Sequence, residues 1–590
     1  MKTIKIIIIS LLVGLNLASC DFLEKDPTYT TPENYFKNEA DAASWLTGTY
    51  AILGQSSFYG NEFLYLVGGD DLGHYGGANR GPNKSGLICN NANTSDPTVA
   101  ALWYTLYSGI NRANIFLENI DAVPDINDDT RKQYKAEARF LRAFYYFTLV
   151  ECWGDVPFKT TSTEDAYNLS IPRTDKQTIY DLIIKEMYGS AEDLKSAQEL
   201  NYLPGRVSKS AAWGMLARVY MFRAGEPKRD KEVGLANSTT SAEITEYFKK
   251  ASYYAQLVKN EGHSLTAKYW DFFIDICSDK YNTALNKDGA KANESIWEVE
   301  FAGNRSTDVR AEGRIGNIIG IQGKDLSSKA SITGKGDPGY AYAFIWNTPK
   351  LLELYEANGD IDRCNWNIAP FTYTQSAGEG TPVDGREFVK GKRAEVEQQY
   401  WDQSFSYGKT DPGSTYGDRE SKNDANKNRN RAAAKYRREY EADKKSKNDT
   451  SINFPLLRYS DILLMIAEAE NEVNHGPNDL AYECINAVRE RAGISKLQAN
   501  LDEENFRKAI KDERAMELCF EYTRRFDLIR WGDYYKLMQE QVDKAQTDES
   551  WKFGTNVYTY FNIPKSYNYF PIPANEIGSN GAIKTNNPGW

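Results

Sequence analysis

The chain has 590 residues, and its 71 Lys and Arg against 82 Asp and Glu give a formal net charge of −11. This acidic balance argues against a nucleic-acid-binding function, which requires a basic surface. The hydrophobic residues, 41% of the chain, provide enough apolar material for a large core. The three histidines, His74, His263 and His475, are too few and too scattered to indicate a histidine metal site or a Ser/His/Asp relay.

The first twenty residues have the pattern of a secretory signal peptide. Two lysines precede an apolar run over residues 6–17, which is too short to span a bilayer. The run leads into Leu-Ala-Ser-Cys, ending at Cys20, and this segment resembles the lipobox of bacterial lipoproteins. We therefore expect residues 1–19 to be removed and Cys20 to carry the lipid anchor, since two or more acyl chains hold a protein stably on a membrane. An ordinary signal peptide followed by a chance cysteine is the alternative.

Helical periodicity dominates the first half and the last third of the chain. Apolar residues recur at steps of three and four over 103–117 and 136–147, which places them on one helix face. Residues 213–220 fit the W-x-x-L-[GA]-x-x-Y spacing of a tetratricopeptide helix. Residues 462–469 and 481–488 form a second possible pair. These patterns predict helix pairs, and they leave open whether the pairs form a true repeat array.

The middle of the chain has a different pattern. Residues 265–420 contain Gly-rich segments and short apolar stretches, which predict loops with a few small strands. One stretch, 296–301, alternates with period two, and we assign its Trp297 to the core. A second loop-rich zone covers 68–97, and long loops in a helical protein are often functional. The charge-rich segment 418–449 is predicted to be a solvated insertion.

Sequence motifs for catalysis are absent. There is no HExxH and no GxSxG, and the partial matches to a phosphate-binding loop and to an EF-hand lack required residues. The six cysteines after Cys20 show no CxxC spacing, so we predict no disulfide framework. Three of them, Cys152, Cys484 and Cys519, fall in apolar helical patterns, where a buried thiol is expected. Charged residues near 513–527 recur at helical spacing with both signs, which indicates packed ion pairs rather than catalysis.

A colinear series of short motifs runs from Cys20 to the last residue. It comprises DFLEKDP (21–27), AEARFLRA (136–143), WGDVP (153–157), Arg173, GRV (205–207), LRY (457–459), RERAG (489–493), Glu513-Arg514, RFDL (525–528), RWG (530–532), PIP (571–573) and NPGW (587–590). In this order the motifs resemble those of the SusD/RagB outer-membrane lipoproteins of Bacteroidetes. The last residue, Trp590, stands where that family usually has Tyr. The resemblance covers essentially the whole mature chain.

The resemblance implies a mainly α fold. Tetratricopeptide-like helix pairs would form a right-handed superhelical scaffold, and an irregular, loop-rich half with a few short strands would carry ligand recognition. We expect an N-terminal SusD-like region with helix pairs over 20–270. A C-terminal SusD/RagB region would cover 271–590, loop-rich over 271–450 and helical over 451–590.

The resemblance also implies a function. Members of the family are non-catalytic, need no cofactor or metal, and lie on the cell-exterior face of the outer membrane, held by their lipid anchor. They capture glycans and deliver them to a SusC-like TonB-dependent transporter. Two alternatives remain open at this point, namely a peptide-capturing member of the same architecture and, from another class, a surface glycoside hydrolase.

Candidate ligand contacts follow from the chemistry of sugar binding. A pyranose needs flat apolar rings for its C–H faces and amide, carboxylate or guanidinium groups for its hydroxyls. The zone 68–97 and the segment after the Gly-rich run 313–339 offer both kinds of group. For each ring, packing of the loop onto the helices is the alternative. The candidates are His74, Tyr75, Asn79, Arg80, Tyr340, Tyr342 and Trp346.

Overall fold

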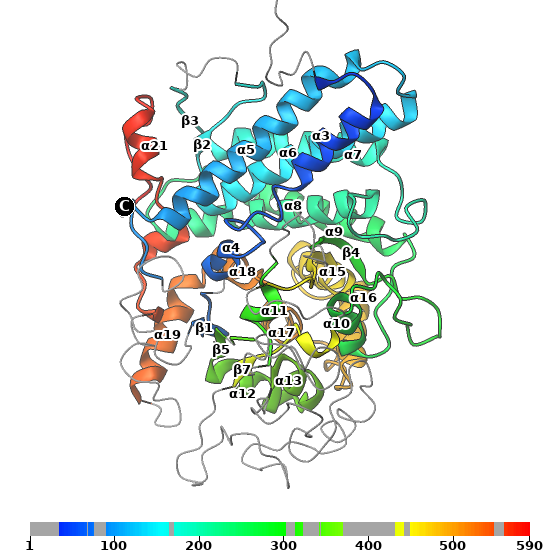
Figure 1. Cartoon of the computed structure of the whole chain (residues 1–590). Helices are drawn as coiled ribbons and strands as arrows, with labels where there is room; N and C mark the ends of the chain where they lie inside the picture. The colour runs from blue at the N-terminus through cyan, green and yellow to red at the C-terminus, as the bar shows by residue number, and fades with distance from the viewer. Residues whose placement is uncertain are drawn as a thin grey trace, which may run out of the picture.

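The structure, a computed structural model, describes most of the chain and is mainly helical (Figure 1). The described residues are 35–67, 69–75, 90–163, 170–301, 313–321, 341–342, 344–369, 431–441, 449–547 and 560–590. Within these ranges, none of the helices combines the length and the apolar character that a bilayer crossing requires. Cys20, Asn79, Arg80 and Tyr340 lie outside the described residues.

The N-terminal half is a stack of long helices in which sequence neighbours pack against each other. The contacts run from α5 to α6, from α6 to α7, from α7 to α8 and from α8 to α9. Polar caps set several helix starts: Asp96 accepts from the backbone of Thr98, and Thr240 forms a reciprocal capping box with Glu243. These helices are α3 (Glu39–Tyr50), α5 (Pro97–Asn119), α6 (Asp128–Trp153), α7 (Lys176–Asp193), α8 (Lys209–Glu232) and α9 (Ser241–Lys259).

A second group of helices, from the C-terminal third, continues this stack. α15 packs against α9, and α18 packs against α8, although these partners lie more than 190 residues apart in the chain. The predicted tetratricopeptide-like pairs are therefore confirmed as α8 with α9 and α15 with α16. The helices of this group are α15 (Tyr459–Asn474), α16 (Asp479–Arg491), α17 (Glu503–Leu518), α18 (Arg524–Trp531), α19 (Tyr534–Thr547) and α21 (Ala574–Ser579).

The middle of the chain holds more helix than its sequence predicted. The expectation of loops with a few strands over 265–420 is wrong for three segments, which form α10 (Tyr269–Cys277), α12 (Pro349–Asn358) and α13 (Ile361–Asn367). α12 has ordinary boundary signals, with Pro349 in its first turn and Gly359 at φ +65° after its end. The shorter helices are α4 (Glu62–Val67) and α11 (Ile315–Ile318), with 3₁₀ turns at Ile120–Ala122, Arg438–Tyr440 and Lys565–Asn568.

The strands are short and form small sheets. β1 (Gly73–Tyr75), β5 (Ile345–Asn347), β7 (Ala432–Ala433) and β6 (Ile368–Ala369) form a sheet in that order. β2 (Val156–Pro157) pairs with β3 (Arg173–Thr174), and β4 (Ser295–Val299) pairs with β8 (Phe454–Arg458). Every residue of β4 and β8 is buried, so the period-two sequence pattern over 296–301 marks a strand with no exposed face, and Glu300 just after it is exposed. The pair lies inside the protein, with both faces covered.

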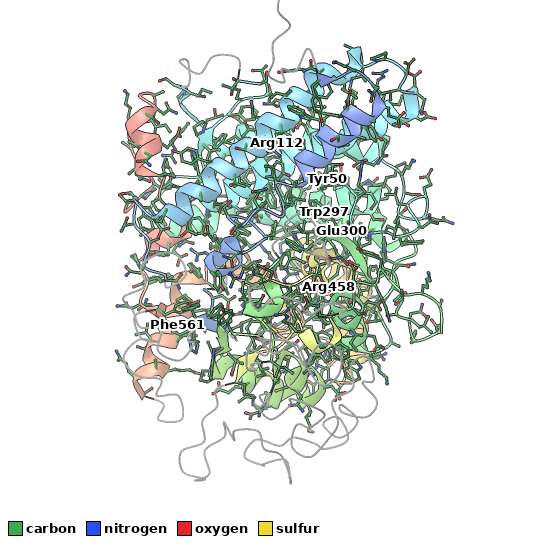
Figure 2. All side chains as sticks on the ribbon, in the orientation of Figure 1. Tyr50, Arg112, Trp297, Glu300, Arg458 and Phe561 are labelled. Carbon is green, nitrogen blue, oxygen red and sulfur yellow. The ribbon has the colours of Figure 1, made fainter. Side chains whose placement is uncertain are left out.

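The core extends through both halves of the molecule. Trp297 of β4 is fully buried, as predicted, and its ring lies edge-on to Phe140 and Phe144 of α6 at centroid distances of 5.2 and 4.9 Å. Figure 2 shows Trp297 in the middle of the molecule. The predicted burial of Cys152, Cys484 and Cys519 is confirmed. Cys277 and Cys364 are buried as well.

The charge-rich segment 418–449 is buried where the structure describes it. Arg431, Lys435, Arg437 and Arg438 are at most 2% exposed, so the prediction of a solvated insertion is wrong for 431–441. The ammonium group of Lys435 donates to the backbone oxygens of Glu517 and Cys519 at 2.9 and 2.7 Å. Composition alone indicated a surface segment because the partners of these cations come from distant helices.

Candidate functional site

The two loop zones that supplied the candidate residues meet in one small sheet. β1 comes from the first zone and β5 from the second, and they pair antiparallel with His74 opposite Trp346 and Tyr75 opposite Ile345. Trp346 also pairs with Ala432 of β7. Figure 1 shows β1, β5 and β7 together beside the helical stack. Two segments about 270 residues apart in the sequence thus form one surface.

Aromatic side chains gather around this strand pair. The rings of Tyr342 and Phe344 stack at a centroid distance of 4.7 Å with 10° between their planes. Tyr75 lies 5.7 Å from Phe344, and Tyr65 at the end of α4 lies 5.9 Å from Tyr75. Tyr75, Tyr342 and Trp346 are partly exposed. We call Tyr65, Tyr75, Tyr342 and Phe344 the aromatic face. Trp346 is paired with His74, so its side chain lies on the other side of the strand pair from that of Tyr75.

A buried carboxylate fixes the start of β1. Asp71 is fully buried and accepts two hydrogen bonds from the guanidinium of Arg524, at 2.8 and 2.9 Å, and one from the ammonium group of Lys350. Burial by itself would raise the pKa of Asp71, but these two cations outweigh it and hold the pKa well below its usual range. The bidentate contact sets both position and angle. Asp71 therefore ties β1 to α18 through Arg524 and to α12 through Lys350.

The neighbouring Asp70 shapes the turn before β1. Its Oδ1 accepts from the backbone nitrogens of Leu72 and Gly73 at 2.8 and 3.1 Å. Burial, reinforced by the negative charge of Asp71, raises the pKa of Asp70 to about 7. The backbone of Thr348 donates to the carbonyl of Leu72 at 2.8 Å, which extends the contact between the two strands. The adjacent acids thus have opposite pKa shifts because only Asp71 has cationic partners.

The turn between α17 and α18 packs against β1. Phe520 and Tyr522 have φ of +61° and +64°, an uncommon conformation for bulky residues. A Cβ on Gly73 would lie 3.0 Å from the ring of Phe520 and 3.1 Å from Ile345. Glycine at this position therefore allows β1 to approach both the turn and β5.

The predicted ligand contacts differ in their placement. Tyr75 and Tyr342 lie together on the aromatic face, partly exposed, whereas the partly exposed Trp346 is paired with His74 and lies on the other side of the strand pair from Tyr75. His74 is fully buried, and its ring lies 6.3 and 6.0 Å from the rings of Tyr560 and Phe561. Its side chain is therefore placed to support β1 from inside rather than to reach a ligand.

Two members of the aromatic face were not among the predicted contacts. Phe344 lies two residues from both Tyr342 and Trp346, so a period-two pattern of rings could have identified it. Tyr65 has no comparable signal, because it belongs to a six-residue helix and meets the face only through tertiary packing.

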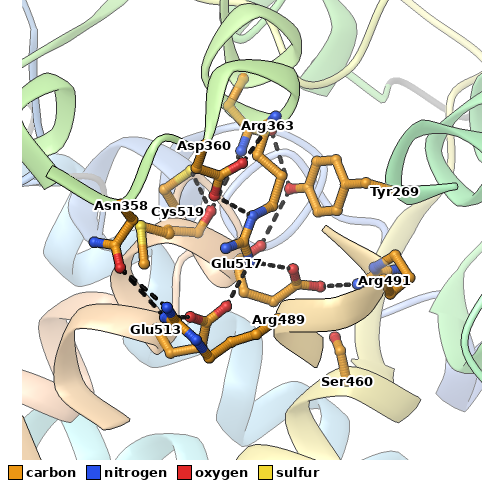
Figure 3. Close-up of polar contacts among 12 residues, drawn as sticks. Tyr269, Asn358, Asp360, Arg363, Ser460, Arg489, Arg491, Glu513, Glu517 and Cys519 are labelled. Carbon is orange, nitrogen blue, oxygen red and sulfur yellow. Dashed lines mark hydrogen bonds and ion pairs between the residues drawn. The ribbon is translucent and has the colours of Figure 1, made fainter. Parts of the chain in front are cut away.

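The charged residues of the C-terminal helices form buried ion pairs, as predicted. Figure 3 shows Glu517 of α17 with Arg363 and Arg491. Glu517 accepts from Arg363 at 2.8 Å, from Arg458 at 2.6 Å and also from Arg491. Burial would raise the pKa of Glu517, but these three guanidiniums hold it well below its usual range. The carboxylate is saturated with structural partners, and the same holds for Glu513, which binds Arg363 and Arg489.

Metal and histidine chemistry find no support in the described ranges. They contain no group of three His, Cys, Asp or Glu side chains placed to hold a metal ion. His263 is buried, with its ring nitrogens 2.7 Å from the backbone oxygen of Asn293 and 2.9 Å from Ser210 Oγ. The aromatic face has partly exposed rings, and the charged residues next to it are paired with each other. This arrangement suits contact with a neutral, ring-shaped ligand.

Comparison with known proteins identifies the class that this fold defines. The SusD family model matches residues 293–590, and a second family model, described as starch-binding associating with outer membrane, matches residues 21–221. The chain therefore belongs to the SusD family, as its motif series indicated.

Individual relatives are similar along the whole chain. SusD-like protein P25 from Formosa agariphila is 27% identical over 605 residues, covering 99% of this chain and 98% of the relative. The solved structure of a SusD homolog from Bacteroides thetaiotaomicron has a TM-score of 0.74 at 24% identity, covering 96% of this chain and 100% of the other. Surface glycan-binding protein A from the same species, in complex with laminarihexaose, has a TM-score of 0.59 at 18% identity, covering 94% and 100%. These structures share the fold.

Proposed function

We propose that the protein binds an oligosaccharide at the aromatic face. The observation that carries this proposal is the packing of Tyr75 at the end of β1 against the stacked pair Tyr342–Phe344, which brings the partly exposed rings of Tyr75 and Tyr342 together. Rings of this kind stack on the C–H faces of sugars, while their hydroxyl groups can hydrogen-bond to sugar hydroxyls. The candidates Asn79, Arg80 and Tyr340 belong to adjoining parts of the chain and would add contacts.

The comparisons support a glycan as the ligand class. One family model is described as starch-binding, and glycan-binding protein A was solved with laminarihexaose. At 18% identity, that structure does not indicate which sugar this protein binds. Under this proposal, the helices of 20–270 and 451–590 form the rigid scaffold, and the loop-rich part of 271–590 presents the ligand surface.

The proposal places the protein on the outer membrane, facing the cell exterior. Cys20 would be acylated and hold the chain to the membrane, and the bound glycan would pass to a SusC-like TonB-dependent transporter without being cleaved. Mass spectrometry of the N-terminal peptide from cells tests the anchor: we expect Cys20 to be the first residue and to carry acyl chains. A non-acylated N-terminus would contradict it.

Binding to a glycan array, followed by calorimetry with the best oligosaccharide, tests the proposed ligand class. We expect Tyr75→Ala and Tyr342→Ala each to weaken binding about five- to tenfold, since one aromatic contact is worth about 1 kcal/mol. Tyr253→Ala is the matched control, because Tyr253 lies on α9 with 56% of its surface exposed. Equal affinities for all four proteins would contradict the site.

Two further assays separate the alternatives. Incubation with polysaccharides should release no reducing ends, and release abolished by one carboxylate substitution would indicate a hydrolase. A peptide pulldown beside the glycan array tests the peptide-binding alternative, since capture of peptides with no glycan signal would favour it.

A further inference from the structure

A small cavity lies where the two halves of the helical stack meet. It has a volume of about 60 Å³ and lies between α6, α8, β8 and the turn from α17 to α18. Most of its wall is apolar, with rings such as Phe63, Phe147 and Phe222. Its polar lining includes Glu151, Arg218 and Thr523. The cavity is separate from the aromatic face, and one residue of its wall, Glu521, shares Arg458 with Glu517.

Several polar groups of this lining lack a partner among the described residues. The carboxyl group of Glu151 makes no hydrogen bond or ion pair with them; only its backbone oxygen is bonded, to Arg229. The buried hydroxyl of Thr523 has no partner there either, and the same holds for Tyr522. Glu151 is partly exposed, whereas leaving a buried hydroxyl unpaired costs about 1–3 kcal/mol, so native proteins rarely do so.

The charges around the cavity are already compensated. Arg218 and Arg514 both bind Asp461, and Arg530 binds Glu468 and Asp527. Glu521 is paired with Arg458 and Lys435, which leaves Glu151 as the acid of the wall without an ion pair among the described residues. These paired residues leave no net charge that would attract an ion, and the described residues offer no metal-binding cluster. The occupant that fits is neutral, small and able to donate and accept hydrogen bonds.

We propose that this cavity is a binding site for a cluster of buried water molecules, held by the carboxyl group of Glu151, the hydroxyl of Thr523 and the guanidinium of Arg218. The volume has room for roughly four waters, at about 15 Å³ for each. Sites for sugars or cofactors are several times larger, at about 300 Å³ or more. The waters satisfy polar groups on α6, on α8 and on the turn after α17, and so connect the two halves of the stack.

The protonation state of Glu151 is consistent with this network. Burial raises its pKa to about 8; Arg218 and Arg229 lower it only in part, and Asp527 and Glu226 raise it further. At neutral pH the carboxyl group is therefore mostly protonated. A neutral carboxyl donates one hydrogen bond and accepts others, as a water cluster requires.

Magnetic relaxation dispersion of water nuclei, which counts long-lived internal waters, tests the proposal in solution. We expect Glu151→Met, which removes the carboxyl group and keeps a side chain of similar length, to lose two or more of the roughly four waters. The control is Glu483→Met, at an exposed acid on α16, which should leave the count unchanged. An unchanged count in a folded Glu151→Met protein would overturn the proposal.

A high-resolution crystal structure provides the second measurement. We expect ordered waters within hydrogen-bond distance of Glu151 and Thr523, and the loss of the water next to residue 523 in Thr523→Val, which keeps the side-chain shape. A dry cavity in the parent protein, or one filled by an ion or an organic molecule, would overturn the proposal. Thr523→Val keeps the test decisive if Glu151→Met does not fold.

Discussion

The ion-pair network of the helical stack and the aromatic face use opposite chemistry. Around Glu517 and Glu513, charges are fully buried and each carboxylate meets two or three guanidiniums. On the aromatic face, Tyr75 and Tyr342 are partly exposed, and the charges of Asp71, Arg524 and Lys350 are paired with each other next to β1. The paired charges therefore fix the positions of the helices, and the partly exposed rings remain available for a ligand.

The two regions are mechanically connected. Arg524 belongs to α18, which packs on α8, and through Asp71 it holds the strand that carries Tyr75. Buried ion pairs add little net stability relative to apolar packing, but they resist any arrangement that leaves a charge unpaired. A fixed scaffold of this kind lowers the ordering cost of ligand binding at the rings.

The largest expected effect is on the network side of this comparison. Glu517→Ala removes the carboxylate shared by Arg363, Arg458 and Arg491, and it leaves three buried cations undercompensated. We expect a loss of about 3–5 kcal/mol in the free energy of unfolding, measured by urea denaturation. Glu490→Ala, which breaks an exposed pair with Lys496, is the control and should cost less than about 1 kcal/mol. Similar losses in both variants would mean that the buried network has no special role.

The connection between the two regions provides the next prediction. Asp71→Asn keeps the side-chain size but removes the charge between Arg524 and Lys350. We expect a loss of about 2–4 kcal/mol in stability and a weaker affinity for the glycan, although Asp71 itself is fully buried. Denaturation and calorimetry together check this. Unchanged glycan affinity in the folded variant would show that the aromatic face does not depend on this clamp.

A pH-dependent effect is expected at Glu151. Its pKa is about 8 in the folded protein and about 4.3 in an unfolded chain. Between these values the unfolded chain releases the proton while the folded protein keeps it, so stability falls as the pH rises from about 4 to 8. Glu151→Gln removes this dependence, and we expect it to gain about 1–3 kcal/mol on the parent protein between pH 5 and pH 8. A stability difference independent of pH would contradict the raised pKa.

The smallest effect is expected from removing one hydroxyl of the aromatic face. Tyr342→Phe keeps the ring that stacks on Phe344. If the ring faces provide most of the binding energy, glycan affinity should change by less than about threefold, against the five- to tenfold loss in Tyr342→Ala. Calorimetry of the two variants separates stacking from hydrogen bonding, and equal losses would assign the energy to the hydroxyl.

The sequence predicted the scaffold better than the site. Apolar spacing over 136–147 is a local signal, and it correctly indicated α6. The pairing of His74 with Trp346 has no local signal, because register between strands about 270 residues apart is set by tertiary packing. Lys435 appeared to be a surface residue for a related reason: its partners, Glu517, Cys519 and Glu521, are separated from it by more than 80 residues.

The motif series predicted the class of protein but not the residues of its site. The family resemblance correctly indicated a helical protein of the SusD class. The choice of Tyr75, Tyr342 and Trp346 depended on residue type and loop position alone. The structure brings Tyr75 and Tyr342 together around Phe344 and places Trp346 in the strand paired with β1, and their contact with a ligand remains a prediction.

A crystal structure of the protein with its best-binding oligosaccharide tests the central proposal most directly. We predict a sugar ring stacked on Tyr75, Tyr342 or Trp346, with the network around Glu517 unchanged from the free protein. A glycan bound instead to the exposed tyrosines of α7 and α9, Tyr188 and Tyr253, with the aromatic face empty, would contradict the account.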